Sequence, residues 1–235
     1  MKETYTAYAA GGLFTQHELM TNVLLKESVW EISGGKFALI LPQSKELRNF
    51  DRPDIDAHIR NHDLLQVARA DLMLARYDGL ELDAGTVVEY MAAKFLGKPA
   101  VLLRCDFRGL DSDRMDSPYN LMTKNWPRTV EVHLDSLSAY TQMMFDGRKD
   151  EEYDGSFDAE IRTELETGRK GVRALAKAIV EGLDAALLLP SPYPEPYREQ
   201  VYDILRHSVG SGFKAVFTEE TMKETIEYLS KQGTL

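Results

Sequence analysis

The sequence lacks the features that mark several large classes of protein. It has one cysteine, Cys105, among 235 residues, which excludes an internal disulfide framework and most cysteine metal sites. No apolar run approaches the ~20 residues of a transmembrane helix, and the N-terminal segment lacks the apolar core of a signal peptide. We therefore expect a soluble cytoplasmic protein with no membrane partner.

Positive charge is also scarce. The chain has 28 Lys and Arg residues against 38 Asp and Glu residues, so its formal net charge is −10. A protein that binds the phosphate backbone of a nucleic acid needs a basic face. The charge balance therefore predicts that no nucleic-acid polymer is a partner.

Motifs for cofactors and for acyl transfer are missing as well. The glycines of GGLFT, residues 11–15, do not have the spacing of either standard phosphate loop, and no Gly-x-Ser-x-Gly elbow occurs. The histidines show no metal-ligand spacing. We expect neither a metal nor another cofactor.

What the sequence does contain is an alternation of short apolar strands with helical segments. Strands are expected at TYTAYAA, KFALIL, DLMLAR and KPAVLLR, and each of the first three is followed by a helical pattern. This alternation indicates an α/β fold with a parallel sheet. Ligands bind such sheets at the carboxyl ends of the strands, where GGLFT and the segment YDGLELD fall.

The second half of the chain is predicted to be mainly helical. A long helical pattern at 161–189, with a possible break near Gly168 or Gly171, carries an apolar stripe that must be buried. The proline-rich segment PSPYPEP then leads to two terminal helices. We divide the chain into an α/β domain at 1–150 and a helical extension at 151–235, whose first helix is expected to pack on the sheet.

Four carboxylates lie between the third strand and its helix, namely those of Asp78, Glu81, Asp83 and Glu89. These carboxylates repel one another, and a connection with a purely structural role has little reason to contain four of them. We expect Glu89 in or near the first helical turn, where free N–H groups would keep it ionised and suited to nucleophilic attack. The structural alternative is that Asp83 caps the helix and Glu89 favours its first turn.

Four motifs in register, AYAAGGLFT, NHDLL, ADLMLARYDGLELDAGTVVEYMAAKFLGKPAVLL and PYNLM, resemble the nucleoside 2-deoxyribosyltransferase family. The resemblance covers about residues 5–125. It implies a flavodoxin-like (Rossmann-like), doubly wound parallel sheet of about five strands, followed here by a helical C-terminal extension. It also implies transfer of a 2-deoxyribosyl group between nucleobases by double displacement, as in nucleotide salvage.

The resemblance also assigns roles to individual residues. Glu89 corresponds to the nucleophile and Tyr8 to the tyrosine that orients it, while Asp63 corresponds to the acid that protonates the leaving base. Asp83 corresponds to the residue that holds the sugar hydroxyls. Asn120 corresponds to an asparagine that reaches the sugar from a neighbouring subunit, which implies a homo-oligomer with shared active sites.

The loop after the first strand is expected to contact substrate through Gly12 and Phe14, although Phe14 could instead pack in the core. Its segment AAGGLFTQHE offers a phosphate only Thr15 and backbone amides, which favours unphosphorylated nucleosides. The expected partners are thus a deoxynucleoside and a free nucleobase. Two alternatives stay open: a nucleoside or nucleotide N-glycosidase with water as acceptor, and a non-catalytic nucleoside-sensing domain.

Overall fold

The computed structural model describes residues 4–44, 53–79, 82–106 and 119–235; Glu81 lies outside these ranges. Five strands form one sheet in the order β2-β1-β3-β4-β5, and every neighbouring pair is parallel. The strands are β1 (Tyr5–Ala10), β2 (Phe37–Ile40), β3 (Leu72–Arg76), β4 (Ala100–Arg104) and β5 (Thr129–His133). The predicted flavodoxin-like α/β fold is confirmed.

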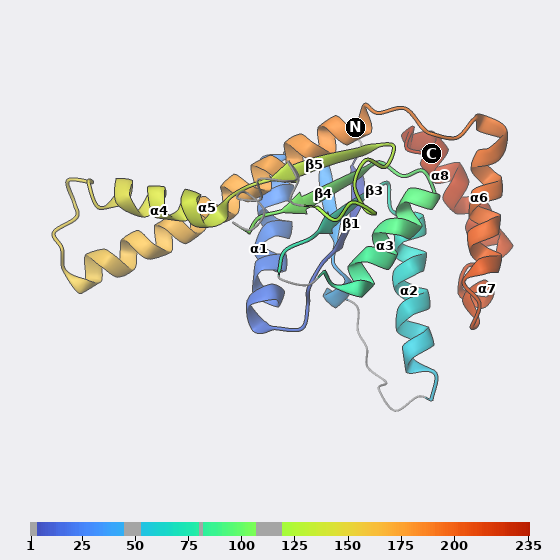
Figure 1. Cartoon of the computed structure of the whole chain (residues 1–235), viewed down its shortest axis with the longest axis horizontal. Helices are drawn as coiled ribbons and strands as arrows, with labels where there is room; N and C mark the ends of the chain where they lie inside the picture. Colours follow the sequence, from blue (N-terminus) through green and yellow to red (C-terminus); the bar gives the residue numbers. More distant parts are fainter. Residues whose placement is uncertain (1–3, 45–52, 80–81, 107–118) are drawn as a thin grey trace.

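Helices cover both faces of the sheet (Figure 1). One face packs against α1 (Gln16–Ile32) and α5 (Phe157–Leu187), and the other against α2 (Ile55–Arg69) and α3 (Ala84–Phe95). The remaining elements are the short 3-10 helix η1 (Pro42–Ser44), α4 (Ser136–Gly147), α6 (Glu195–Ser208), α7 (Phe213–Val216) and α8 (Glu219–Gln232).

Local sequence explains where the helices near the edge of the sheet begin. Thr15 caps α1 through a capping box, since its side chain accepts from Glu18 N while Glu18 accepts from Thr15 N. Asp83 caps α3 by accepting from Thr86 N at 2.7 Å. Both helix starts are therefore fixed directly beside the carboxyl ends of β1 and β3.

The central strands are buried on both faces, so they read as continuous apolar runs. Along β4, Val101 and Leu103 belong to the core under α1 and α5, whereas Ala100 and Leu102 belong to the core under α2 and α3. This is the pattern of a parallel sheet with helices on both sides.

Helix α5 runs without interruption through Gly168 and Gly171, so the predicted break is wrong. Apart from the backbone of α5 itself, no atom of the described residues lies within 4 Å of the place that a Cβ would take on either glycine. The part of its stripe at Leu175, Ile179 and Leu183 is buried against the sheet and α1. Within the described ranges, no helix is long and apolar enough to cross a membrane.

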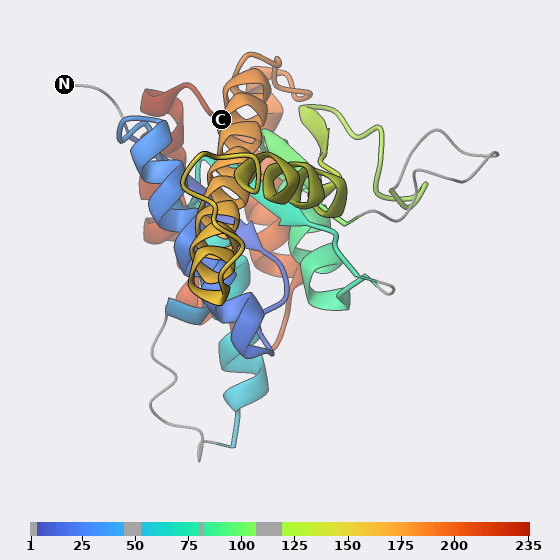
Figure 2. The same cartoon turned by 90° about the vertical axis from the view of Figure 1, so that its left-hand side faces the viewer.

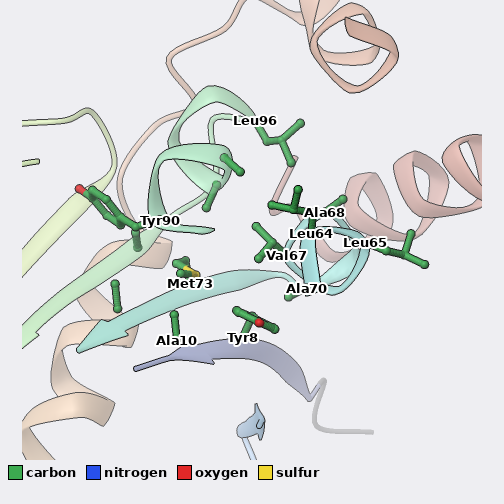
Figure 3. Packing of buried hydrophobic residues seen from close by; sticks show 14 of the residues in the cluster. Tyr8, Ala10, Leu64, Leu65, Val67, Ala68, Ala70, Met73, Tyr90 and Leu96 are labelled. Carbon is green, nitrogen blue, oxygen red and sulfur yellow. The ribbon is translucent and has the colours of Figure 1, made fainter. Parts of the chain in front are cut away.

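The helices after α5 form an outer layer on α2. In Figure 3, Val67 of α2 lies on the side of the helix that faces Tyr8 and Met73 of the sheet, whereas Leu65 points away from it. Beyond α2 the same core cluster continues with apolar side chains from the segment that runs from α6 to α8, namely Tyr202, Phe213, Phe217, Met222 and Leu229. Helix α7 was not predicted, because its four residues are too few to show a helical period.

A buried carboxylate links this outer layer to the sheet. Asp71, which is fully buried before β3, accepts hydrogen bonds from Thr6 N (2.7 Å) and Thr6 Oγ1 (2.8 Å) on β1. It also accepts from Tyr228 Oη (3.0 Å) on α8 and from Thr234 Oγ1 (3.1 Å). Buried carboxylates are tolerated only when they are fully hydrogen-bonded, as here.

We predict that Asp71→Ala lowers the free energy of unfolding by about 3 kcal/mol or more, because it leaves several buried donors without an acceptor. Asp135→Ala is the matched control, since Asp135 only caps α4 at the surface and its loss should cost much less than the loss of Asp71. Urea denaturation measures both variants. Equal losses would contradict the central role given to Asp71.

Candidate active site

The candidate site lies where the direction of the chain through the sheet reverses. From β1 the chain passes to β2 on one side, and β3, β4 and β5 then follow on the other side. The carboxyl ends of β1 and β3 therefore open the crevice in which ligands of doubly wound sheets bind.

Tyr8 and Glu89 meet beneath this crevice. Tyr8 is fully buried on the face of β1 that packs under α2 and α3, and its Oη donates to Glu89 Oε1 at 2.6 Å. Burial, followed by the charges of Glu89 and Asp63, raises the pKa of Tyr8 above its usual range. The phenol therefore stays protonated and serves as a fixed donor to the carboxylate.

Glu89 lies near the first turn of α3, as predicted, but its pKa differs from the prediction. It is the sixth residue of α3, beyond the first turn whose N–H groups lack partners. Burial raises its pKa to about 7; the hydrogen bond from Tyr8 opposes this shift, and the charges of Asp63 and Asp83 add to it. The expectation of a helix start that keeps Glu89 ionised is therefore wrong, because desolvation dominates.

Asp63 and Asp83 complete a group of three acids. Asp63, on α2, lies close enough to raise the pKa values of both Tyr8 and Glu89. Asp83 Oδ2 accepts from both Thr86 N and Thr86 Oγ1, so its carboxylate is held in place by α3 itself. Elements from three parts of the sequence thus bring Tyr8, Asp63, Asp83 and Glu89 together.

An open cavity of about 730 Å³ lies at the same edge of the sheet, and Gly12, Phe14 and Asp83 are on its wall. Tyr8, Asp63 and Glu89 are not on this wall, so Asp83 is the residue shared by the cavity and the acid group. Phe14 is 78% exposed, which excludes its packing in the core and leaves its ring available for a base.

Sequence reasoning missed Arg76, which ends β3 and lines the cavity. Its Nη2 lies 3.4 Å from Gly12 O, and its Nε lies 3.5 Å from Asp78 Oδ2. The loop after β1 is therefore not limited to Thr15 and backbone amides. The signal was the position of Arg76 at a strand end, since parallel strands bring their carboxyl ends together.

The cavity remains acidic despite this arginine. Its wall carries the carboxylates of Glu18, Asp78, Asp83 and Asp106 against the guanidinium of Arg76 and the imidazole of His17. Arg76 is also the ion-pair partner of Asp78. This balance favours an uncharged ligand. In the part of the chain that the structure describes, no three His, Cys, Asp or Glu side chains are grouped as metal ligands.

Asn120 is set apart from the acid group. It is exposed in the single chain, and its Oδ1 accepts from Met122 N at 2.9 Å. In the same turn, Asn120 O accepts a hydrogen bond from Thr123 N. The described contacts of Asn120 are thus those of a turn, and its predicted contact with a sugar would have to be made outside its own chain.

Residues 7–122 match the family model for nucleoside 2-deoxyribosyltransferase, a range that contains every predicted site residue. This part of the chain belongs to the nucleoside 2-deoxyribosyltransferase family. The match ends before α4, so the family model does not extend to the helices from α4 to α8.

Two solved structures are similar to the chain at low sequence identity. One is a conserved protein from Enterococcus faecalis V583, with 20% identity and a TM-score of 0.44; the match covers 77% of this chain and 98% of that one. The other is the CMP N-glycosidase BcmB from Clostridium botulinum, with 17% identity and a TM-score of 0.37, covering 58% and 94%. A search of curated proteins finds no match.

We predict that Glu89→Gln stabilises the fold at pH 8 by about 1–2 kcal/mol, and hardly at all at pH 5. Because the folded pKa of Glu89 lies near 7 and its ordinary value is 4.5, ionising it disfavours the folded state increasingly as pH rises through this window. Glutamine removes that charge and keeps an acceptor for Tyr8. Thermal melts should show a midpoint a few degrees higher at pH 8; a larger gain at pH 5 would refute the assignment.

Proposed function

We propose that the chain is a nucleoside 2-deoxyribosyltransferase that moves a 2-deoxyribosyl group from one nucleobase to another through a covalent ester with Glu89. The family match over residues 7–122 supports the class of enzyme. The single observation that carries the mechanism is the 2.6 Å hydrogen bond from Tyr8 to Glu89 inside a group of acids.

In the first half-reaction, the Glu89 carboxylate attacks the anomeric carbon and the carbon–nitrogen bond to the base breaks. The bonding electrons leave with the base, and Asp63 supplies the proton that neutralises it. In the second half-reaction, a nitrogen of the incoming base attacks the same carbon, the ester bond breaks, and the proton of that base passes to Asp63. Two inversions give net retention of configuration.

The other residues of the site position the sugar. Asp83, fixed by its cap on α3, accepts hydrogen bonds from the sugar hydroxyls in this proposal. Gly12 and Phe14 form the wall on which the base lies, with the exposed ring of Phe14 stacked against it. Asn120 reaches the sugar of a neighbouring subunit, which makes the enzyme a homo-oligomer with shared sites.

Hydrolysis of the same bond, with water as acceptor, is the second candidate. The observation in its favour is Arg76, because a guanidinium beside Gly12 supplies the cation that a nucleotide phosphate would need. The four carboxylates on the cavity wall oppose it. The charge of the cavity wall therefore favours a nucleoside over a nucleotide as substrate.

The deciding experiment is incubation of the protein with a deoxynucleoside and a different free base, followed by chromatography. We expect the exchanged nucleoside with the wild type and no exchange with Glu89→Gln, since the amide cannot attack. Release of base without exchange would establish the hydrolase. Exchange by Glu89→Gln at a near-normal rate would rule out the ester.

We predict that Tyr8→Phe shifts the pH dependence of kcat/KM. In the wild type, kcat/KM should rise with pH through about 7 as Glu89 ionises. Losing the Tyr8 donor raises the pKa of Glu89 further, so the rise should move to higher pH and the rate at pH 7 should fall about tenfold. Tyr5→Phe, on the same strand but the other face of the sheet, is the control and should leave the profile unchanged.

We also predict that Asp63→Asn slows transfer most for bases that are poor leaving groups, by about 10²-fold or more, because the amide cannot supply a proton. A series of nucleosides whose bases differ in leaving ability measures this. Equal slowing across the series would assign Asp63 to positioning instead.

A further inference from the structure

Helix α4 and the first half of α5 form an arm that projects beyond the sheet (Figure 1) and is seen nearly end on in Figure 2. Between these two helices, Met144 and Ala159 are buried. The two helices are also tied by an ion pair between Arg148 and Glu160. The arm is thus a defined helical hairpin, although it extends past the core of the protein.

One face of the arm has the character of a core and is uncovered. An α-helix returns to the same angle after 18 residues. Phe157, Ile161 and Leu165 therefore occupy the angles of Leu175, Ile179 and Leu183, which are buried on the sheet and α1. Yet Phe157 is 80% exposed and Leu165 is 57% exposed. Within residues 4–44, 53–79, 82–106 and 119–235, no segment covers this arm stripe of Phe157, Ile161 and Leu165.

Helix α1 carries a second uncovered strip. Met20, Val23 and Trp30 recur at helical spacing on its outer side, opposite the buried Leu25 and Val29, and each of the three is about half exposed. We call Met20, Val23 and Trp30 the α1 strip. Contiguous exposed apolar surfaces of this kind often mark a contact with another molecule.

We propose that the arm stripe of one copy packs on the α1 strip of a second copy, and the reverse, in a two-fold dimer. Such an isologous contact uses each surface twice. The six side chains offer on the order of 600–700 Å² per copy, close to the ~800 Å² per partner of a stable interface. The exposed apolar area of these six side chains therefore approaches what a stable contact with a second copy of this chain needs.

Charge supports the same partner. Glu27 lies within the α1 strip, between Val23 and Trp30, and Arg169 lies one turn beyond Leu165 at the edge of the arm stripe. Neither residue makes an ion pair or hydrogen bond within the described residues. In the proposed dimer, Glu27 of each copy faces Arg169 of the other copy.

The interface lies beside the candidate active site, since Leu175 on α5 and Thr21 on α1 line the same cavity. A partner seated between the arm and α1 would therefore border the open mouth of the cavity. The inference goes beyond the proposed function by naming the surface, and it does not depend on the reaction.

Light scattering after gel filtration tests the interface on the full chain at micromolar concentration. We expect the wild type at twice the chain mass of 26.6 kDa, and both Phe157→Glu and Val23→Glu at the mass of one chain. Ile204→Glu is the control, because Ile204 is an exposed apolar residue on α6, outside both surfaces, and this variant should stay dimeric. Circular dichroism establishes that each variant is folded.

A charge exchange provides a second test. Glu27→Arg and Arg169→Glu should each raise the dissociation constant of the dimer at least tenfold, and the double variant should recover most of that loss. A monomeric wild type, or a folded Phe157→Glu or Val23→Glu variant that remains dimeric, would overturn the proposal. These masses are measured without substrate, so a failure of the proposed reaction would leave the result unaffected.

Discussion

The register between β1 and β3 is the constraint on which the rest of the molecule depends. Asp71 fixes it by binding both the amide and the hydroxyl of Thr6, and Tyr8 then lies opposite Met73, facing α3. A shift of one residue would turn Tyr8 to the face covered by α1 and α5. Glu89 would then lose its hydrogen-bond donor. The buried contact between Asp71 and Thr6 thus fixes the position from which Tyr8 donates its hydrogen bond to Glu89.

The acid group has a cost that the fold must offset elsewhere. The carboxylates of Asp63, Asp83 and Glu89 lie together, and Tyr8 donates a hydrogen bond to Glu89. Burial nevertheless raises the pKa of Glu89 to about 7. A carboxylate poised near neutral pH alternates between a protonated form, which the fold prefers, and an ionised form, which can react. Sites of this kind are stabilised by the scaffold around them rather than by their own contacts.

The sequence predicted the parts of the structure that arise from local patterns. The alternation of strand and helix patterns predicted the parallel sheet. Thr15 and Asp83, whose side chains are typical of N-caps, do cap α1 and α3. The features that the sequence did not predict depend on contacts between residues far apart in the chain. Desolvation of Glu89 depends on what packs over it, and the approach of Arg76 to Gly12 depends on the pairing of β1 with β3. The four-residue α7 is held by its buried phenylalanines, which no period reveals.

The contacts of Asp71 also order the folding of the chain in time. Its partner Thr6 is 65 residues away and is synthesised first, whereas Thr234 follows Asp71 by 163 residues. At about 5–20 residues per second, a ribosome needs roughly 8–30 s to cover that distance. During this interval the nascent sheet holds a carboxylate that only β1 has satisfied. Water must hydrogen-bond to Asp71 in place of Tyr228 and Thr234 until α8 has been synthesised and packs beside the sheet.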